Sequence, residues 1–366
     1  MTKFFLLFSL SMIACKTSPT NETSESKFFQ NDSLLSEFKK IEKLDYRDAK
    51  YLGLGEEYIP PNEASVFAEY ANLLGKMHSK NNQEIQSKRP QSINYRGMHA
   101  KGHGCLEGTI EYDNPRGNYL SGIFKNTKTY AVVARFSNGS SFYQADSERD
   151  LLGLAIKVKN VTDGKRLIKD GKDEQDFLMT SAPHHHTRDI HHLMNFIFAR
   201  ASGRFQSIKF PDVLAILLKQ THYRPENALT ASYWSRAPFK WGEGNTVKYF
   251  VKPCNESREA IKHSKLSDDH YIEKISDYSS TRPTCFNMYV QPQTDAYKEP
   301  IENHQIEWKS PAEKIAKIVF PIQNVDRSET CQSLKFSPWN GIFAHKGLGN
   351  FNRARRLIYD KAASLR

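Results

Sequence analysis

The sequence has no apolar run long enough to span a bilayer as a helix. Its longest run, Phe4 to Ala14, falls well short of the roughly 20 residues that a span requires. It also has no compact Lys/Arg run and no nucleic-acid-binding motif, so the formal net charge of +11 favours an anionic partner such as phospholipid or a carboxylated cofactor over nucleic acid. No internal repeat or interdomain linker is visible. With 39% hydrophobic residues, the chain has enough apolar material for a large core.

The first residues have the order of a secretory signal, with Lys3 followed by an apolar stretch and then Cys15. Residues 12–15 read MIAC, which resembles a bacterial lipobox, whose cysteine is lipidated. We therefore predict a signal peptide over 1–14, a lipid-anchored flexible linker and N-terminal arm over 15–55, and a folded domain over 56–366. Export to the cell envelope follows, as a lipoprotein or a periplasmic protein. Ordinary signal cleavage nearby, or a buried apolar segment, are the alternatives.

Cysteine is scarce, with five residues and none in C-x-x-C spacing, which argues against a structural zinc site. If Cys15 carries lipid, four cysteines remain in an oxidising compartment: Cys105, Cys254, Cys285 and Cys331. Four cysteines allow three pairings, and the sequence leaves the choice open. We expect Cys105 to be a small buried residue or a half-cystine.

The folded part combines helical and β-prone segments. Pro60 and Pro61 break the chain, Asn62 offers an N-cap, and the residues that follow have an apolar helical face. Short β-prone segments then occupy 105–112, 129–137, 153–159, 285–290 and 315–322. Helical patterns occupy 187–201, 211–220 and 352–363. We predict a single α+β domain around an antiparallel sheet or barrel, with surrounding helices.

Three regions bring together arginine, histidine, tyrosine and small residues. Residues 96–104 read RGMHAKGHG and residues 133–140 read VARFSNGS, followed by RDLLGLAIKV over 149–158. Residues 355–359 read RRLIY. In this order they resemble the motifs of the haem catalases: a segment R-x-x-HAKG, a strand V-x-RFS, a strand G-x-A-x-K and a C-terminal R-x-x-x-Y. The resemblance covers residues 60–366 and implies a catalase-like antiparallel β-barrel that binds haem b.

The resemblance implies a role for each matching residue. His99 corresponds to the distal histidine and Tyr359 to the axial ligand of the haem iron. Ser137 corresponds to the serine that hydrogen-bonds near the distal histidine. The arginines around the haem correspond to Arg96, Arg135 and Arg355.

The chemistry of these residue types agrees with those roles. Arg355 and Tyr359 are four residues apart, so on a helix they share a face, where a guanidinium stabilises a phenolate. An anionic oxygen ligand favours ferric iron. A neutral His99 can take a proton from a bound hydroperoxide and return it to the leaving oxygen. Arg96 and Arg135 can form charge-assisted bonds to haem propionates.

The chain departs from the catalase pattern in three places. Leu151 and Leu152 replace the Pro and Arg of a usual RDPRG. Residues 173–180 read DEQDFLMT, without the asparagine expected on the distal side. Seven residues follow Tyr359, so the C-terminal helical region of large catalases is not expected, and the oligomeric state is left open.

Residues 184–192 hold five of the 13 histidines and invite three interpretations: a bound metal, the lining of a haem channel or pocket, or a polar, solvated start of a helix. The cluster lacks the HExxH order of hydrolytic zinc sites.

The predicted function is haem-dependent decomposition or reduction of peroxides, of catalase or peroxidase type, on hydrogen peroxide or a lipid hydroperoxide. A fatty-acid hydroperoxide isomerase similar to the catalase-like allene oxide synthases is the alternative enzyme. A non-catalytic haem-binding surface lipoprotein is the alternative outside enzymes. The partners expected are the peroxide and, through the anchor, a membrane, with no nucleic acid.

Overall fold

The computed structural model describes residues 32–46, 49, 52–113, 119–126, 128–168, 171–201, 204–255 and 266–366. The signal peptide predicted over 1–14 and the lipidation predicted at Cys15 lie outside the described residues. Within them, no helix combines the length and the apolar character needed to cross a membrane. The boundaries proposed at 15–55 and 56–366 stay predictions.

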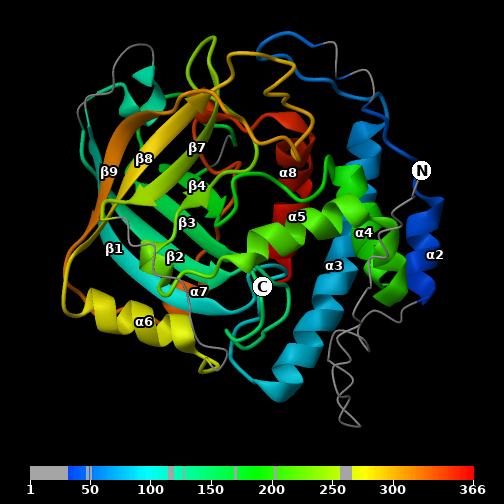
Figure 1. Ribbon diagram of the computed structural model, residues 1–366, viewed down its shortest axis with the longest axis horizontal. Helices are drawn as coiled ribbons and strands as arrows, with labels where there is room; N and C mark the ends of the chain where they lie inside the picture. Colours follow the sequence, from blue (N-terminus) through cyan, green and yellow to red (C-terminus); the bar gives the residue numbers. More distant parts are fainter. Residues whose placement is uncertain are drawn as a thin grey trace, which may run out of the picture.

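An antiparallel β-barrel forms one side of the molecule (Figure 1). Strand β5 pairs with both β4 and β7, which closes a ring of eight strands in the order β5-β4-β3-β2-β1-β9-β8-β7. The strands of the ring are β1 Gly102–Tyr112, β2 Tyr130–Asn138, β3 Leu152–Lys159, β4 Glu174–Thr180, β5 Tyr233–Trp234, β7 Thr246–Pro253, β8 Thr284–Pro292 and β9 Glu313–Phe320. The short β6, Phe239–Lys240, adds a hairpin to β7. The predicted α+β barrel is confirmed.

Apolar side chains fill the barrel because successive residues of a strand point to opposite faces. Leu106, Phe136, Leu154 and Phe286 come from four different strands and belong to this one core. The strands predicted from the sequence match β1, β2, β3, β8 and β9 to within a few residues, whereas β4, β5, β6 and β7 were not predicted.

Helices pack outside the barrel, most of them along one side (Figure 1). They are α2 Asp32–Lys40, α3 Glu63–Lys88, α4 Ile190–Ala201, α5 Pro211–His222, α6 His270–Ser279, α7 Glu329–Ser333 and α8 Gly349–Ser364. A second apolar cluster joins α2, α3, α4 and α8 through residues that include Tyr70, Met194, Phe198 and Phe351. Figure 1 shows α8 standing between the barrel and α3. The helices predicted over 187–201, 211–220 and 352–363 correspond to α4, α5 and α8.

A buried ion-pair cluster fixes α8 in this position. The guanidinium of Arg353 donates to Glu57 Oε1 at 2.5 Å, to Glu63 Oε2 at 2.7 Å and to Glu302 Oε1 at 2.9 Å. The three carboxylates come from the chain before α3, from the first turn of α3 and from the loop after β8. The expected N-cap role of Asn62 is not seen, because its side chain makes no capping hydrogen bond and Glu63 meets Arg353 instead.

Two disulfides cross-link the barrel region, Cys105–Cys331 and Cys254–Cys285. This is one of the three pairings that the sequence allowed, and it makes Cys105 a half-cystine. Paired cysteines are typical of proteins that fold in an oxidising compartment, in agreement with the predicted export.

Candidate functional site

The outer face of β2 and β3 carries residues that the sequence motifs singled out. Phe136 points into the barrel core, so its neighbours Arg135 and Ser137 lie on the opposite face. In the antiparallel register Ser137 lies opposite Gly153 and Arg135 lies opposite Ala155. Because these two residues are small, no large side chain projects from the middle of that face. Ala155 is only half-buried although it lies mid-strand.

His99 lies against this face in a defined orientation. Its Nδ1 lies 2.6 Å from the backbone oxygen of Asn138 and 3.1 Å from Ser137 Oγ. A carbonyl only accepts, so Nδ1 carries the proton, and Nε2 of the neutral ring keeps its lone pair. The ring lies directly over Gly153, where an added Cβ would sit 2.4 Å from Nδ1. The structure thus brings His99 and Ser137 together.

Burial keeps His99 neutral at neutral pH. The pKa of its imidazole is lowered to about 4, mainly by desolvation and in part by the positive charges of Arg96, Arg135 and Arg355. The carbonyl of Asn138 opposes these effects in part. A neutral imidazole with a free Nε2 can act as a general base.

The Arg149-Asp150 motif supports the backbone of His99. Asp150 Oδ2 accepts hydrogen bonds from the amides of Gly139 at 3.0 Å and Ser140 at 2.7 Å. The carbonyls of the same two residues accept from the amides of His99, at 3.4 Å, and Ala100, at 3.0 Å. His99 has a φ of 58°, a left-handed conformation that is uncommon for a residue with a side chain, and this loop holds it there.

The positions that depart from the catalase motifs have structural explanations. Leu151 and Leu152 are both buried, and Leu152 is part of the barrel core. Strand β4 carries no asparagine, and its buried Asp176 instead accepts from Lys157 Nζ at 2.8 Å and from the amide of Ser337 at 2.9 Å. Desolvation raises the pKa of Asp176 to about 6. The distal asparagine therefore has no counterpart on this strand.

Three arginines lie close together, and two of them, Arg96 and Arg135, act electrostatically on His99. Arg96 Nε donates to the carbonyl of His99 at 2.8 Å, and Arg135 Nη1 donates to the carbonyl of Leu334 at 2.7 Å. The third is Arg366, whose Nη2 donates to the carbonyl of Gln332 at 2.6 Å. Burial above all, and then the charges of the other two, lower the pKa of Arg135 well below its ordinary value.

Sequence reasoning missed Arg366. It lies two residues beyond the end of α8, so helical periodicity gave no signal for its placement.

This arginine cluster, Arg96, Arg135 and Arg366, is suited to an anionic ligand. In the described part of the chain its hydrogen-bond partners are neutral carbonyl and amide oxygens, which orient the guanidiniums without cancelling their charge. Among the described residues, Arg96 Nη2 and Arg366 Nε are buried and have no hydrogen-bond partner. Buried donors without acceptors cost free energy, which a bound carboxylate would recover through charge-assisted hydrogen bonds.

Helix α8 presents Arg355 and Tyr359 to the same region. Arg355 Nη1 donates to Asn352 Oδ1 at 3.2 Å, and its charge lowers the pKa of His99. Tyr359, one turn later, is half-buried and acts electrostatically on Arg135 in β2. Helix α8 therefore brings Arg355 within electrostatic reach of His99, and Tyr359 within electrostatic reach of Arg135.

The run of histidines makes separate contacts and does not converge. The ring of His185 stacks on His186 and packs on Phe351, with centroid distances of 4.3 and 4.2 Å. His191 Nδ1 lies 2.5 Å from the hydroxyl of Tyr70. Over the described residues, no group of three His, Cys, Asp or Glu side chains is placed to hold a metal ion. Burial above all, and then the charge of Arg236, lower the pKa of His185 well below its ordinary value.

No family model matches the chain, and no curated protein matches it in sequence. Solved structures do match. A fungal catalase superposes with a TM-score of 0.58 over 77% of this chain at 16% identity. The chain has a catalase-like fold.

Two further catalases agree with this assignment. A bacterial catalase superposes with a TM-score of 0.59 over 78% of the chain at 16% identity, and catalase A from Saccharomyces cerevisiae with 0.58 over 79% at 17%. The chain spans about three fifths of the length of these catalases, namely 61%, 59% and 64%. At this level of identity the likeness establishes the catalase-like fold and leaves the chemistry to the residues of the site.

Proposed function

We propose that this chain binds haem b and uses it to decompose or reduce peroxides, with Tyr359 as the axial ligand of the iron and His99 as the distal acid/base. One observation carries the proposal. The proton on His99 Nδ1 is committed to the carbonyl of Asn138, so the basic Nε2 is free in a site that α8 completes with Arg355 and Tyr359. A catalase-like fold that carries His99, Arg355 and Tyr359 at these positions supports the function of an oxidoreductase that acts on peroxides.

The residues present fit haem. Haem b carries two propionates, and the arginine cluster offers buried, unpartnered N–H groups for them at Arg96 and Arg366. Gly153 accommodates the His99 ring, and the half-buried Ala155 beside it places no bulky side chain on that face of the strand. Arg355 and Tyr359 share a face of α8, so the guanidinium can stabilise a phenolate oxygen there.

Each side chain has a defined task. Haem, when bound, supplies an iron centre that exchanges electrons with the peroxide. His99 Nε2 takes the proton from the hydroperoxide and then returns it to the oxygen that leaves, so the ring ends neutral as it began. Ser137 Oγ and the carbonyl of Asn138 hold Nδ1 and keep the imidazole plane fixed during both transfers.

A fatty-acid hydroperoxide isomerase is the second candidate. It is favoured by β4, which supplies no distal asparagine and whose Leu178 lies in register with Ala155, so an apolar, half-buried side chain borders the site. We further propose that lipidation at Cys15 holds the protein at a membrane, where lipid hydroperoxides are at hand.

The test of the haem proposal is an absorption spectrum. The chain with Cys15→Ser is purified with haem supplied and compared with Tyr359→Phe and with Tyr297→Phe, a control tyrosine that is 80% exposed. We expect a ferric Soret band with high-spin features in the parent and in the control, and its loss or shift in Tyr359→Phe. A parent without haem, or an unchanged spectrum in Tyr359→Phe, would refute the assignment.

Turnover then separates the candidates. Hydrogen peroxide and a fatty-acid hydroperoxide are each offered to the haem-loaded parent and to His99→Ala. Because His99 supplies the acid/base step, we expect the variant to keep haem and lose a factor of about 10² to 10⁴ in rate. Fast consumption of hydrogen peroxide alone excludes the isomerase, and haem binding without turnover of either substrate identifies a binding protein.

A further inference from the structure

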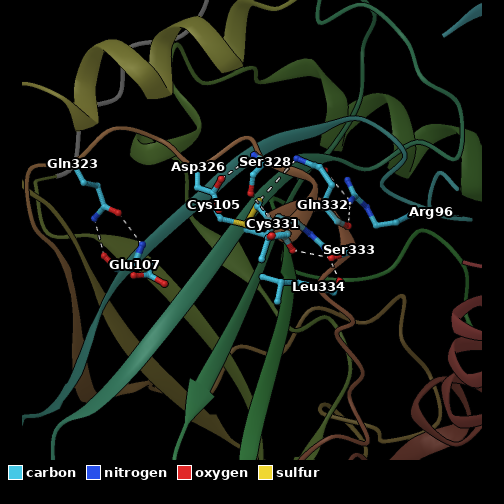
Figure 2. The surroundings of a disulfide bond; sticks show 12 residues. Arg96, Cys105, Glu107, Gln323, Asp326, Ser328, Cys331, Gln332, Ser333 and Leu334 are labelled. Carbon is cyan, nitrogen blue, oxygen red and sulfur yellow. Dashed lines mark hydrogen bonds between the residues drawn. A yellow bond between two sulfur atoms is a disulfide. The ribbon is translucent and has the colours of Figure 1, made fainter. Parts of the chain in front are cut away.

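The short helix α7 is tied covalently to the barrel beside the arginine cluster. Its Cys331 forms a disulfide with Cys105 in β1, and both cysteines are buried (Figure 2). Ser328 caps the helix, accepting from the amide of Cys331 at 3.3 Å. A helix of five residues has little stability of its own, so α7 depends on these ties for its position.

The residues next to Cys331 hold the arginine cluster. Gln332 accepts from Arg96 Nη1 through its side-chain oxygen at 3.0 Å and its carbonyl at 3.3 Å, and the same carbonyl accepts from Arg366. Figure 2 shows Gln332 reaching from the disulfide to Arg96. Two residues further on, the carbonyl of Leu334 accepts from Arg135. Every member of the cluster therefore has an acceptor within three residues of Cys331.

The other end of the disulfide lies on the strand that pairs with Arg135. Cys105 is opposite Arg135 in the β1–β2 register. The disulfide therefore links the segment that supplies the acceptors, Gln332 and Leu334, to the sheet that carries Arg135. Such support is needed because like-charged guanidiniums repel one another. After burial, the charge of Arg366 lowers the pKa of Arg96, and the charges of Arg96 and Arg366 lower the pKa of Arg135.

We propose that Cys105 and Cys331 are positioning residues of the haem site: their disulfide holds α7 so that Gln332 and Leu334 aim the arginine cluster at the haem propionates. This inference rests on the proposed haem function. It predicts that the site is redox-sensitive. A dithiol reduces the bond by supplying two electrons and two protons, forms two cysteine thiols and closes to its own cyclic disulfide, after which α7 is no longer fixed to β1.

The chain offers a matched control in its other disulfide, Cys254–Cys285, which joins the region after β7 to β8. The experiment uses the haem-loaded chain with Cys15→Ser and measures the rate of haem transfer to an excess of apo-globin. We expect C105A/C331A to release haem about tenfold faster or more, as is typical when groups that orient a ligand-binding shell are removed. We expect C254A/C285A to release haem at the rate of the parent.

Haem dimethyl ester separates positioning from general destabilisation, because its propionates carry no charge. The difference between C105A/C331A and the parent should vanish with this ester. An equal acceleration with haem and with the ester would overturn the proposal, as would release of haem at the parent rate. A parent that takes up no haem refutes the proposed function itself, so the two failures are distinguishable.

Reduction provides the measurement if C105A/C331A does not fold. The C254A/C285A variant is treated with a dithiol in urea below its unfolding transition, and alkylation followed by mass spectrometry reports the state of Cys105 and Cys331. We expect the reduced form to lose haem about tenfold faster than the oxidised form, and Q332A, which keeps the disulfide, to lie between them. Equal rates in the reduced and oxidised forms would contradict the inference.

Discussion

His99 shows how neighbouring backbone can define the chemistry of one side chain. The carbonyl of Asn138 selects the tautomer of the imidazole, and burial keeps the ring neutral. Gly153 has no side chain, so the ring can pack directly on its backbone. The motif of His99 was recognisable in the sequence, and so were Ser137 and Arg135. Arg366 was not, because its role comes from a contact with Gln332, 34 residues away along the chain.

The lowered pKa of His99 predicts the pH at which the turnover rate falls on the acid side of its pH profile. Its pKa is about 4 in the folded chain, against an ordinary value of about 6.5, so Nε2 stays unprotonated over most of the acid range. We expect peroxide turnover to hold between pH 8 and pH 5 and to fall with a midpoint near pH 4, approximate values that follow from this shift. A rate profile with circular dichroism over the same range is the measurement, and an acid limb near the ordinary pKa would contradict it.

The same shift bears on stability. At pH values between the ordinary pKa and about 4, His99 is protonated in the unfolded chain and unprotonated in the folded chain. The contribution of His99 to the free energy of unfolding is therefore fully present above the ordinary pKa and falls as the pH falls through this window.

At the scale of elements, α8 depends on charges that reach it from three other segments. Arg353 is surrounded by Glu57, Glu63 and Glu302, and their hydrogen bonds hold its pKa above the ordinary value although burial opposes this. Six residues later the same helix carries Tyr359, so this cluster positions the proposed iron ligand from outside the site.

We predict that Arg353→Ala destabilises the chain by about 3 to 5 kcal/mol, because it leaves buried carboxylates without their counter-charge. Arg356→Ala, on the exposed face of the same helix, is the control and should cost less than about 1 kcal/mol. The free energy of unfolding from urea titration measures both. Equal effects of the two substitutions on the free energy of unfolding would show that the ion-pair cluster does not stabilise the fold.

Elements with a regular pattern could be predicted from the sequence, and the others could not. Strand β7 is buried on both faces over nearly its whole length, so it shows no alternation of apolar and polar residues. Strand β4 carries Glu174 and Asp176, which argue against a buried strand until Lys157 from β3 is placed between them. Helix α7 is too short to show a period.

At the scale of the whole molecule, the two disulfides differ in the length of chain that they close. Cys105 and Cys331 are 226 residues apart and Cys254 and Cys285 are 31 apart. In the chain-entropy description these loops correspond to about 5 and about 4 kcal/mol of stabilisation. We predict that C105A/C331A lowers the free energy of unfolding of the haem-free chain more than C254A/C285A does, by about 1 to 2 kcal/mol.

Urea titration of the haem-free parent and both variants under oxidising conditions tests this order. Equal losses, or a larger loss in C254A/C285A, would contradict it. The measurement is independent of haem, so it also supplies the stability baseline for the haem-release experiments.

The sequence by itself determined the fold class, because its apolar periodicities and ordered motifs depend on residues close together in the chain. It also marked His99, Ser137, Arg96, Arg135, Arg355 and Tyr359 as the residues to follow. Only the tertiary structure decided the disulfide pairing, the membership of Arg366 in the arginine cluster and the tautomer of His99. These depend on contacts between distant segments, which become specific only when the barrel closes and α7 and α8 take their places against it.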